Sequence, residues 1–295
     1  MEDKPETKPE DASSLSGVCV VSFESRMSLE ACRLFERRSA TVLSAPSLQE
    51  VPLEDQKAAF EFGEFLLKGE VDVLVLTTGV GVRMLVDALS SRWNREQIIA
   101  ALAKAQLVCR GPKPVGALKA MGLKPSFVVP EPNTWRDIVT AFDEQQLGKD
   151  KRVWVQEYGR ANQELATALA QRSSFLGQVA LYAWRLPDDL EPLKAAVAAM
   201  VAGTVAVATF TAGVQVDHLF EVAERLSLGQ ALLQALRERI VVASIGPMTS
   251  ERLTAHGVSA DIEPQHPKLG HLVQAVAARA HDALRQKRRQ ALAST

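Results

Sequence analysis

The stretch that decides the fold runs from Val71 to Leu89 and reads V-D-V-L-V-L-T-T-G-V-G-V-R-M-L-V-D-A-L. Its first half is a continuous apolar run of strand length, which ends at Thr77-Thr78-Gly79. Apolar residues then return at helical spacing, so the stretch predicts a buried parallel strand, a tight turn and a helix. The first amides of such a helix lack intrahelical acceptors, and its dipole favours an anion there.

The same pattern occurs a second time, from Thr204 to Val222, as T-V-A-V-A-T-F-T-A-G-V-Q-V-D-H-L-F-E-V. Aligning Thr77 with Thr211 gives an offset of 211 − 77 = 134 residues. The register extends over the chain and places Gly79 on Gly213, Val20-Val21 on Trp154-Val155, Arg26 on Arg160 and, one residue later, Gly111-Pro112 on Gly246-Pro247. A register of this length predicts the duplication of an α/β unit.

The bulk composition is that of a globular protein of about two domains. The chain has 295 residues, of which 47% are apolar and 23% charged, and its net charge of -1 gives no general attraction to nucleic acid or an anionic membrane. Three cysteines, Cys19, Cys32 and Cys109, lack metal-site spacing, so we expect buried thiols. No apolar run could span a bilayer, and the charged N-terminus is unlike a secretion signal. We therefore expect a cytoplasmic protein.

Strands and helices alternate along the expected structure. We expect strands at 17–23, 41–45, 72–76, 106–109, 127–129, 153–156, 205–209, 240–244 and near 260–262, with an extended segment at 179–184. We expect helices at 28–38, 54–68, 80–90, 114–121, 134–143, 189–202, 214–226, 229–237, 247–255 and 269–285, the first with Ser28 as its N-cap. This alternation predicts parallel sheets covered by helices on both faces.

Ligands of such sheets bind outside the carboxyl ends of the strands. That rule selects six strand-to-helix junctions: Glu24–Arg26, Thr77–Gly79, Arg110–Lys113, Glu157–Arg160, Thr211–Gly213 and Gly246–Thr249. They are rich in Gly, Thr and Arg, and they hold no Ser/His/Asp set, G-x-G-x-x-G fingerprint or Walker motif. The pattern favours a site without a cofactor or metal, which binds an anion through amides, hydroxyls and cations.

Three motifs resemble the uroporphyrinogen-III synthase family. They are T-T-G-V-G-V-R from Thr77, the paired Gly-Pro junctions, and I-G-P-M-T-S-E-R-L-T-A-H-G from Ile245. The segment R-G-P-K-P-V-G-A-L from Arg110 resembles a variant found in part of that family. The resemblance covers about residues 17–285.

The resemblance implies two flavodoxin-like parallel-sheet domains, joined by a two-stranded antiparallel linker, with an active site in the cleft between the domains. One domain would combine residues 17–44 with 188–285, and the other would span 53–178. Residues 45–52 and 179–187 would form the linker. Residues 1–16 would be a disordered tail, and 286–295 a C-terminal tail.

The implied reaction is the cofactor-free cyclisation of hydroxymethylbilane to uroporphyrinogen III, with loss of water and inversion of ring D. Loss of the hydroxyl would give an azafulvene-type cation, and a spiro intermediate would reorder the last ring. The substrate carries eight carboxylates, which suits amides, hydroxyls and arginines. We expect a monomer, with no nucleic-acid or membrane partner.

The resemblance also implies a set of site residues. Thr249 and Tyr182 are the catalytic candidates, although Thr249 could equally be a helix-capping residue and Tyr182, five residues before Pro187, could equally be packing. The candidates for substrate binding are Arg26, Thr77, Thr78, Gly79, Arg110, Gly111, Lys113, Tyr158, Gly159, Arg160, Thr211, Ala212, Gly213, Gly246 and Met248.

Two alternatives to an enzyme remain open. One is a non-catalytic module of the same fold that senses a tetrapyrrole or another anion. The other is a two-lobed binding protein of the periplasmic type, against which the charged N-terminus counts. Turnover of hydroxymethylbilane separates the synthase from both.

Overall fold

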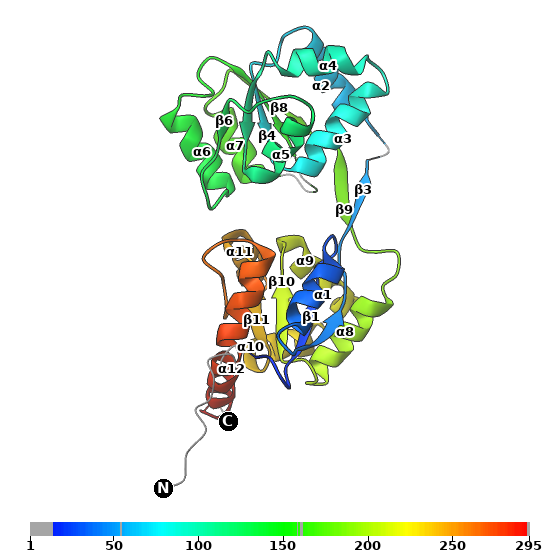
Figure 1. The fold of residues 1–295 in the computed structure, drawn as a ribbon, viewed down its shortest axis with the longest axis vertical. Coiled ribbons are helices and arrows are strands. Elements are labelled where there is room, and N and C mark those ends of the chain that lie inside the picture. The colour runs from blue at the N-terminus through cyan, green and yellow to red at the C-terminus, as the bar shows by residue number, and fades with distance from the viewer. Residues whose placement is uncertain (1–13, 54, 158, 160–161, 294–295) are drawn as a thin grey trace. The chain divides into compact units, whose positions relative to one another are not determined.

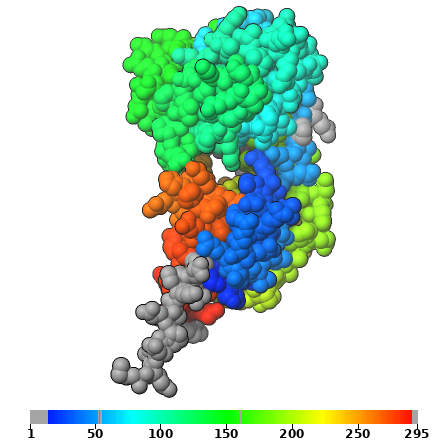
Figure 2. All heavy atoms as spheres, in the orientation of Figure 1, coloured from blue at the N-terminus to red at the C-terminus, as the bar shows by residue number. Residues whose placement is uncertain are grey.

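The computed structural model describes residues 14–53, 55–157, 159 and 162–293. The chain divides into two compact units (Figure 1). Unit 1 combines the chain up to Gln49 with the chain from Leu186 onward, and unit 2 runs from Glu50 to Arg185. Each unit is a parallel sheet with helices on both faces, so the predicted α/β class is confirmed. Buried side chains pack between the elements of each unit, and Figure 2 shows the outer surface that the heavy atoms form on one face.

Unit 2 contains a five-stranded parallel sheet in the order β6-β5-β4-β7-β8. Its strands are β4 (Val73–Leu76), β5 (Gln106–Cys109), β6 (Phe127–Val128), β7 (Arg152–Gln156) and β8 (Phe175–Val179). Its helices are α2 (Lys57–Leu67), α3 (Gly79–Ser90), α4 (Arg95–Leu102), α5 (Pro112–Ala120), α6 (Trp135–Glu144) and α7 (Gln163–Ala170). Because side chains alternate along a strand, Leu74 and Leu76 pack with α2 to α5, and Val73 and Val75 pack with α6 and α7.

Unit 1 contains a four-stranded parallel sheet in the order β11-β10-β1-β2. Its strands are β1 (Cys19–Ser22), β2 (Thr41–Ser44), β10 (Val207–Phe210) and β11 (Val241–Ser244). Its helices are α1 (Ser28–Glu36), α8 (Glu191–Val201), α9 (Gly213–Arg225), α10 (Gly229–Glu238), α11 (Pro247–Ala255) and α12 (Leu269–Ala293). Ala208 and Phe210 pack with α8, α9 and α10, whereas Val207 packs with α1 and α12.

Two short strands form a separate antiparallel pair, β3 (Gln49–Pro52) with β9 (Tyr182–Arg185). The amide of Leu53 donates to the carbonyl of Leu181 at 3.1 Å, which continues the pairing by one residue. The expected single extended segment at 179–184 is wrong in detail. Val179 ends the sheet strand β8, and the pairing with β3 begins only at Tyr182.

The ends of several elements also differ from the expectation. Ser28 is the first helical residue of α1 rather than its N-cap, which is Met27. Residues 260–262 form no strand, only a single bridge between Ile262 and Ala243. Helix α12 continues past residue 285 to Ala293, and Lys287 within it is buried and donates to the carbonyls of Leu236 in α10 and Ile240 before β11. Leu15, inside the expected tail, is buried; residues 1–13 lie outside the described residues.

The duplication needs a one-residue correction in its first strand. In unit 2, Val155 pairs with Val75, whereas in unit 1 Val21 pairs with Ala208, the counterpart of Leu74. The structural counterpart of Gln156 is therefore Phe23, and that of Glu157 is Glu24, at an offset of 133 rather than 134. The apolar pattern could not show this shift, because both strands are buried on both faces.

Candidate functional site

The strand order of each sheet defines where a ligand would bind. In unit 2 the chain runs outward from β4 to β5 and β6, and β7 and β8 lie on the other side of β4. In unit 1 the same change of direction falls between β1 and β10. The carboxyl ends of these strand pairs are the usual binding position in open α/β sheets. They carry Thr77-Thr78 with Gln156 in unit 2, and Thr211-Ala212 with Glu24 in unit 1.

The turn after β4 is held by a buried glutamine from the neighbouring strand. The amides of Thr77 and Thr78 both lie 3.3 Å from Oε1 of Gln156. The hydroxyl of Thr77 donates to the Gln156 carbonyl at 2.7 Å. These amides therefore have acceptors within the protein, in contrast to the expectation of open turn amides. The helix amides that remain for a ligand begin at Gly79.

Thr78 connects this turn to Tyr182. Its hydroxyl accepts a hydrogen bond from the Gly81 amide at 3.0 Å, which caps α3. The same hydroxyl lies 3.1 Å from the phenol oxygen of Tyr182. Tyr182 is 2% exposed and packs in the apolar core of unit 2. Both interpretations of Tyr182 thus have a counterpart in the structure: its ring is packed, and its hydroxyl lies at the carboxyl edge of the sheet.

Two glycines of the turn are required by their neighbours. A Cβ on Gly79 would lie 2.6 Å from the carbonyl oxygen of Lys113, so glycine permits α3 and α5 to approach closely. A Cβ on Gly81 would lie 2.1 Å from the side-chain nitrogen of Gln156. Gly81 therefore provides the space that the glutamine occupies.

The turn after β10 has a different acceptor for the same two amides. Oε1 of Gln215, in the first turn of α9, accepts from the amides of Thr211 at 2.7 Å and Ala212 at 3.1 Å. Nε2 of Gln215 donates to the Thr211 hydroxyl at 2.9 Å. That hydroxyl donates in turn to the carboxylate of Glu24 at the end of β1. Gln215 is 1% exposed, whereas Thr211, Ala212 and Gly213 are partly exposed.

The two Gly-Pro junctions follow the strands next to these turns. Gly111 and Gly246 have extended backbones, with φ of −177° and 170°, and each precedes a helix with proline in its first position. In unit 1, Thr249 is 4% exposed near the start of α11, and Met248 is partly buried. In unit 2, the side-chain amide of Asn133 donates to the Arg110 carbonyl at 2.7 Å and fixes that junction.

The remaining candidates are charged side chains and the loop after β7. Arg26 and Lys113 are exposed, and Arg110 is partly buried. Gly159 has a φ of 63°, and a Cβ on it would lie 2.2 Å from the ring of Trp184. Burial raises the pKa of Glu157, which precedes this loop and accepts from Gln178 at 2.6 Å. Tyr158 and Arg160 lie outside the described residues.

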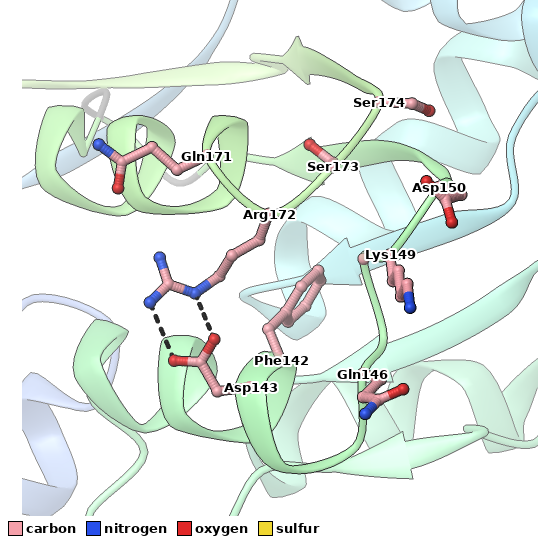
Figure 3. Close-up of a pocket in the computed structure, with 10 residues that line it drawn as sticks. Phe142, Asp143, Gln146, Lys149, Asp150, Gln171, Arg172, Ser173 and Ser174 are labelled. Carbon is pink, nitrogen blue, oxygen red and sulfur yellow. Dashed lines mark hydrogen bonds and ion pairs between the residues drawn. The ribbon is translucent and has the colours of Figure 1, made fainter.

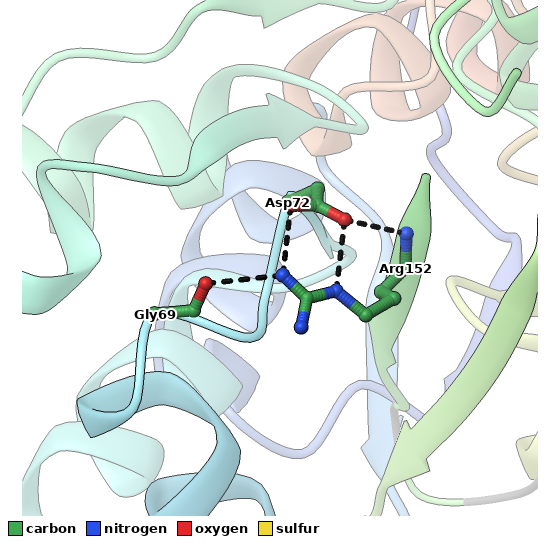
Figure 4. A network of polar contacts seen from close by, with 3 residues as sticks. All are labelled: Gly69, Asp72 and Arg152. Carbon is green, nitrogen blue, oxygen red and sulfur yellow. Dashed lines mark hydrogen bonds and ion pairs between the residues drawn. The ribbon is translucent and has the colours of Figure 1, made fainter. Parts of the chain in front are cut away.

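The opposite, amino edge of the unit 2 sheet carries different features. A cavity of about 420 Å³ lies between the loops that precede β7 and β8 (Figure 3). Its lining includes Arg172, which pairs with Asp143 through two hydrogen bonds of 2.6 and 2.9 Å. At the same edge, Arg152 pairs with Asp72 and donates to the Gly69 carbonyl (Figure 4). These two ion pairs therefore lie at the amino edge of the sheet, opposite the predicted junctions.

The described residues hold no group of three or more His, Cys, Asp or Glu side chains that could bind a metal ion. Within the same ranges, no helix combines the length and the apolar character needed to cross a membrane.

Sequence reasoning missed the two glutamines that hold the turns. Gln156 is a polar residue at the end of the buried apolar run V-W-V, and such an exception to a core pattern is a usable signal. Gln215 stands three residues after the N-cap Ala212, the position of the glutamine or glutamate in a capping box. Neither signal names the partner, since Gln156 is 79 residues from Thr77 in the sequence.

Comparison with known proteins gives consistent matches over most of the chain. The chain is 24% identical over 259 residues to an uncharacterized protein, YjjA, of Bacillus subtilis, covering 88% of this chain and 94% of that one. It resembles a mutant uroporphyrinogen III synthase of the extremely thermophilic bacterium Thermus thermophilus with a TM-score of 0.69 and 28% identity, over 91% of this chain and 99% of that one. The wild-type enzyme in another crystal form gives a TM-score of 0.53 and 29% identity, with 90% and 98% covered.

The family model described as "Uroporphyrinogen-III synthase HemD" matches residues 30–274. This match spans both units and includes the turns after β4 and β10 and both Gly-Pro junctions. Together with the fold, it shows that this chain belongs to the uroporphyrinogen-III synthase family.

Proposed function

We propose that this chain is a uroporphyrinogen-III synthase, which cyclises hydroxymethylbilane to uroporphyrinogen III with inversion of ring D and loss of water. The family acts on a small-molecule tetrapyrrole. The observation that carries the proposal is the position of the glycine, threonine and cation junctions. All of the described ones follow carboxyl ends of strands, where each sheet changes direction or beside that point.

Substrate carboxylates would bind at these junctions. The first free amides of α3 and α9 begin at Gly79 and Gly213, and the positive ends of both helix dipoles favour an anion there. Arg26, Arg110 and Lys113 supply cations near the same edges. Several such contacts would hold a flexible linear tetrapyrrole so that the correct carbon of the last ring attacks.

The catalytic candidates are Tyr182 and Thr249. Departure of the substrate hydroxyl as water needs a proton, while the pyrrole nitrogen supplies the electron pair that leaves a conjugated cation. The phenol of Tyr182 is a proton donor of suitable type, and its oxygen lies 3.1 Å from the Thr78 hydroxyl at the turn after β4. The Thr249 hydroxyl, near the start of α11, would contact substrate next to the Gly246-Pro247 junction.

The first experiment is turnover of hydroxymethylbilane by purified protein without added cofactor. The proposal predicts the type III isomer, faster than spontaneous cyclisation gives the type I isomer. Tight binding of the substrate with type I product alone would instead support the sensing module. Absence of both substrate binding and turnover would contradict the synthase and the sensing module alike.

A second experiment tests Thr249 with a matched control in the same helix. Thr249→Ala is expected to lower kcat by about tenfold or more with little change in stability, as expected for a group that orients substrate. Thr254→Ala removes a hydroxyl that donates to the Ser250 carbonyl at 3.0 Å further along α11. Equal rates for the two variants would remove Thr249 from the site.

The expected cytoplasmic location and monomeric state stay predictions. The oligomeric state is measured directly by light scattering of the purified chain.

A further inference from the structure

We propose that Gln156 and Gln215 are positioning residues, each of which fixes one substrate-binding turn by accepting two successive backbone amides on one side-chain oxygen. The inference rests on the proposed function, because it concerns the turns at which substrate would bind. It goes beyond that function by assigning a role to two side chains that would not touch substrate themselves.

In unit 2, Gln156 fixes the direction of the groups that face the ligand. Its Oε1 accepts from the amides of Thr77 and Thr78, and the glutamine is fully buried. With both amide planes fixed, the Thr78 hydroxyl is aimed at the Gly81 amide and at the Tyr182 phenol. Loss of the glutamine would release the link between the turn and the proposed proton donor.

In unit 1, Gln215 performs the same task with a further contact. It accepts from the amides of Thr211 and Ala212, and it also donates to the Thr211 hydroxyl. The hydroxyl proton of Thr211 is thereby directed to Glu24. Ala212 has no side-chain oxygen, so unit 1 lacks the hydroxyl cap that Thr78 gives to Gly81, and the corresponding amide, that of Gln215, donates to the Ala212 carbonyl at 3.1 Å.

The two glutamines do not occupy equivalent positions. The counterpart of Gln215 is Gly81, and a Cβ there would meet the amide of Gln156 at 2.1 Å. The counterpart of Gln156 is Phe23, whose ring stacks on Phe210 at 4.9 Å between centroids. Only one of the two positions can hold the side chain, and each unit uses a different one. The two units therefore supply an acceptor to the same pair of amides from different positions. This indicates that the turn requires an acceptor for these two amides.

A neutral acceptor also suits a polyanionic substrate. A carboxylate at either position could accept the same two amides, but its charge would lie beside the helix ends that favour anions. Glutamine satisfies the amides without adding a negative charge at the binding edge.

The test compares Gln156→Met with a control at the other edge of the same two strands. Methionine keeps most of the side-chain length but offers the two amides no effective acceptor. The control is Asp72→Asn, which weakens the Arg152 pair between the amino ends of β4 and β7. For each variant we would measure kcat, KM, the fraction of type III product and Tm.

We expect Gln156→Met to lower kcat by about tenfold or more and to raise the fraction of type I product, because a misplaced turn misorients the substrate. Asp72→Asn should lower Tm by less than Gln156→Met and leave kcat and product ratio unchanged. A purely structural glutamine would make the two variants alike in kcat, and that result would overturn the inference.

A second test, which is more specific, moves the acceptor to the position that it has in unit 1. The double variant Gln156→Ala with Gly81→Gln places the glutamine where unit 1 has it and removes the side chain that would clash. We expect it to recover at least half of the type III fraction lost in Gln156→Ala. No recovery in a folded double variant would contradict the inference.

Gln215→Met provides the same comparison in unit 1 if the Gln156 variants do not fold. An unchanged kcat and product ratio in folded Gln215→Met would then overturn the inference. If the wild-type chain shows no turnover, the proposed function is refuted before any variant is compared. If the wild type is active and folded Gln156→Met or Gln215→Met has the same kcat and product ratio, only the positioning role is refuted.

Discussion

The turns after β4 and β10 have the same backbone task and different side chains. In unit 2 a threonine caps the helix and a glutamine from the neighbouring strand accepts the two preceding amides. In unit 1 an alanine stands at the cap, and one glutamine in the helix itself accepts both amides.

This difference shows which part of the turn is constrained. Buried amides must have acceptors, since an unsatisfied one costs about 1–3 kcal/mol. The source of the acceptor is free to change, provided that the space for its side chain is vacated elsewhere. Unit 2 meets that condition with Gly81, which leaves space for Gln156. Unit 1 meets it with Gln215 in the helix and Phe23 at the strand end.

The largest expected effect is a difference in stability between alanine substitutions at Gly79 and Gly213, the first residues of α3 and α9. Gly79→Ala should destabilise the protein by about 2–3 kcal/mol, because its Cβ would lie 2.6 Å from a backbone oxygen that cannot turn aside. Gly213→Ala meets Arg252 Cβ at 3.1 Å and should cost less than about 1 kcal/mol. Urea unfolding of both variants measures this difference. Equal losses would mean that the two helix contacts are equally tolerant.

The next effect concerns the cap. Thr78→Ala makes unit 2 resemble unit 1 at this position and removes the hydroxyl that accepts from the Gly81 amide. We expect a loss of about 1–2 kcal/mol in the free energy of unfolding. The reverse change, Ala212→Ser, should alter stability by less than about 0.5 kcal/mol, because the amide that the serine would cap, that of Gln215, already donates to the Ala212 carbonyl at 3.1 Å. A large gain from Ala212→Ser would show that the Ala212 carbonyl is a poor acceptor for the Gln215 amide.

A smaller effect is expected at the amino edge, where only unit 2 has the Arg152 pair. The Arg152 hydrogen bond holds the pKa of Asp72 below its usual range. The carboxylate therefore stabilises the fold above the unfolded pKa of about 3.9, and the contribution is lost as pH falls through the folded pKa. Since both side chains are more than a third exposed, Asp72→Asn should cost no more than about 1 kcal/mol at pH 7. The difference in unfolding free energy between Asp72→Asn and wild type should shrink in acid. A difference that stays constant from pH 7 to 3 would exclude the carboxylate charge as its cause.

The smallest effect compares the two carboxylates that follow β7 and β1. Burial raises the pKa of Glu157, so folding favours its protonated form. The resulting stability is complete below the unfolded pKa of about 4.3 and is lost as pH rises through the folded pKa. Glu157→Gln should therefore be slightly more stable than wild type at pH 7 and equal to it at pH 4. Glu24→Gln should be less stable at pH 7, because that carboxylate accepts from the Thr211 hydroxyl and the Met27 amide. Thermal melts at both pH values test the pair, and a less stable Glu157→Gln would refute the burial argument.

Several elements were predictable because one stretch contains the whole signal. The run before Thr77 and the helical spacing after it fixed β4 and α3 to within a residue. By contrast, β8 was missed as a sheet strand, since it is partly exposed and its pattern F-L-G-Q-V lacks a continuous apolar run. Helix α4 was also missed, because its eight residues carry only two buried side chains, Ile98 and Leu102.

The sequence by itself determined the class of fold, the duplication and the edge at which the junctions lie, because these follow from apolar periodicity and from the local chemistry of Gly, Pro and Thr. Only the tertiary structure decided the one-residue register shift, the buried Lys287 and the acceptors of the turn amides. Gln156 and Thr77 are separated by 79 residues and meet only because β7 pairs beside β4. Contacts of that kind depend on strand register, and a single residue of slip would bring a different side chain to the turn.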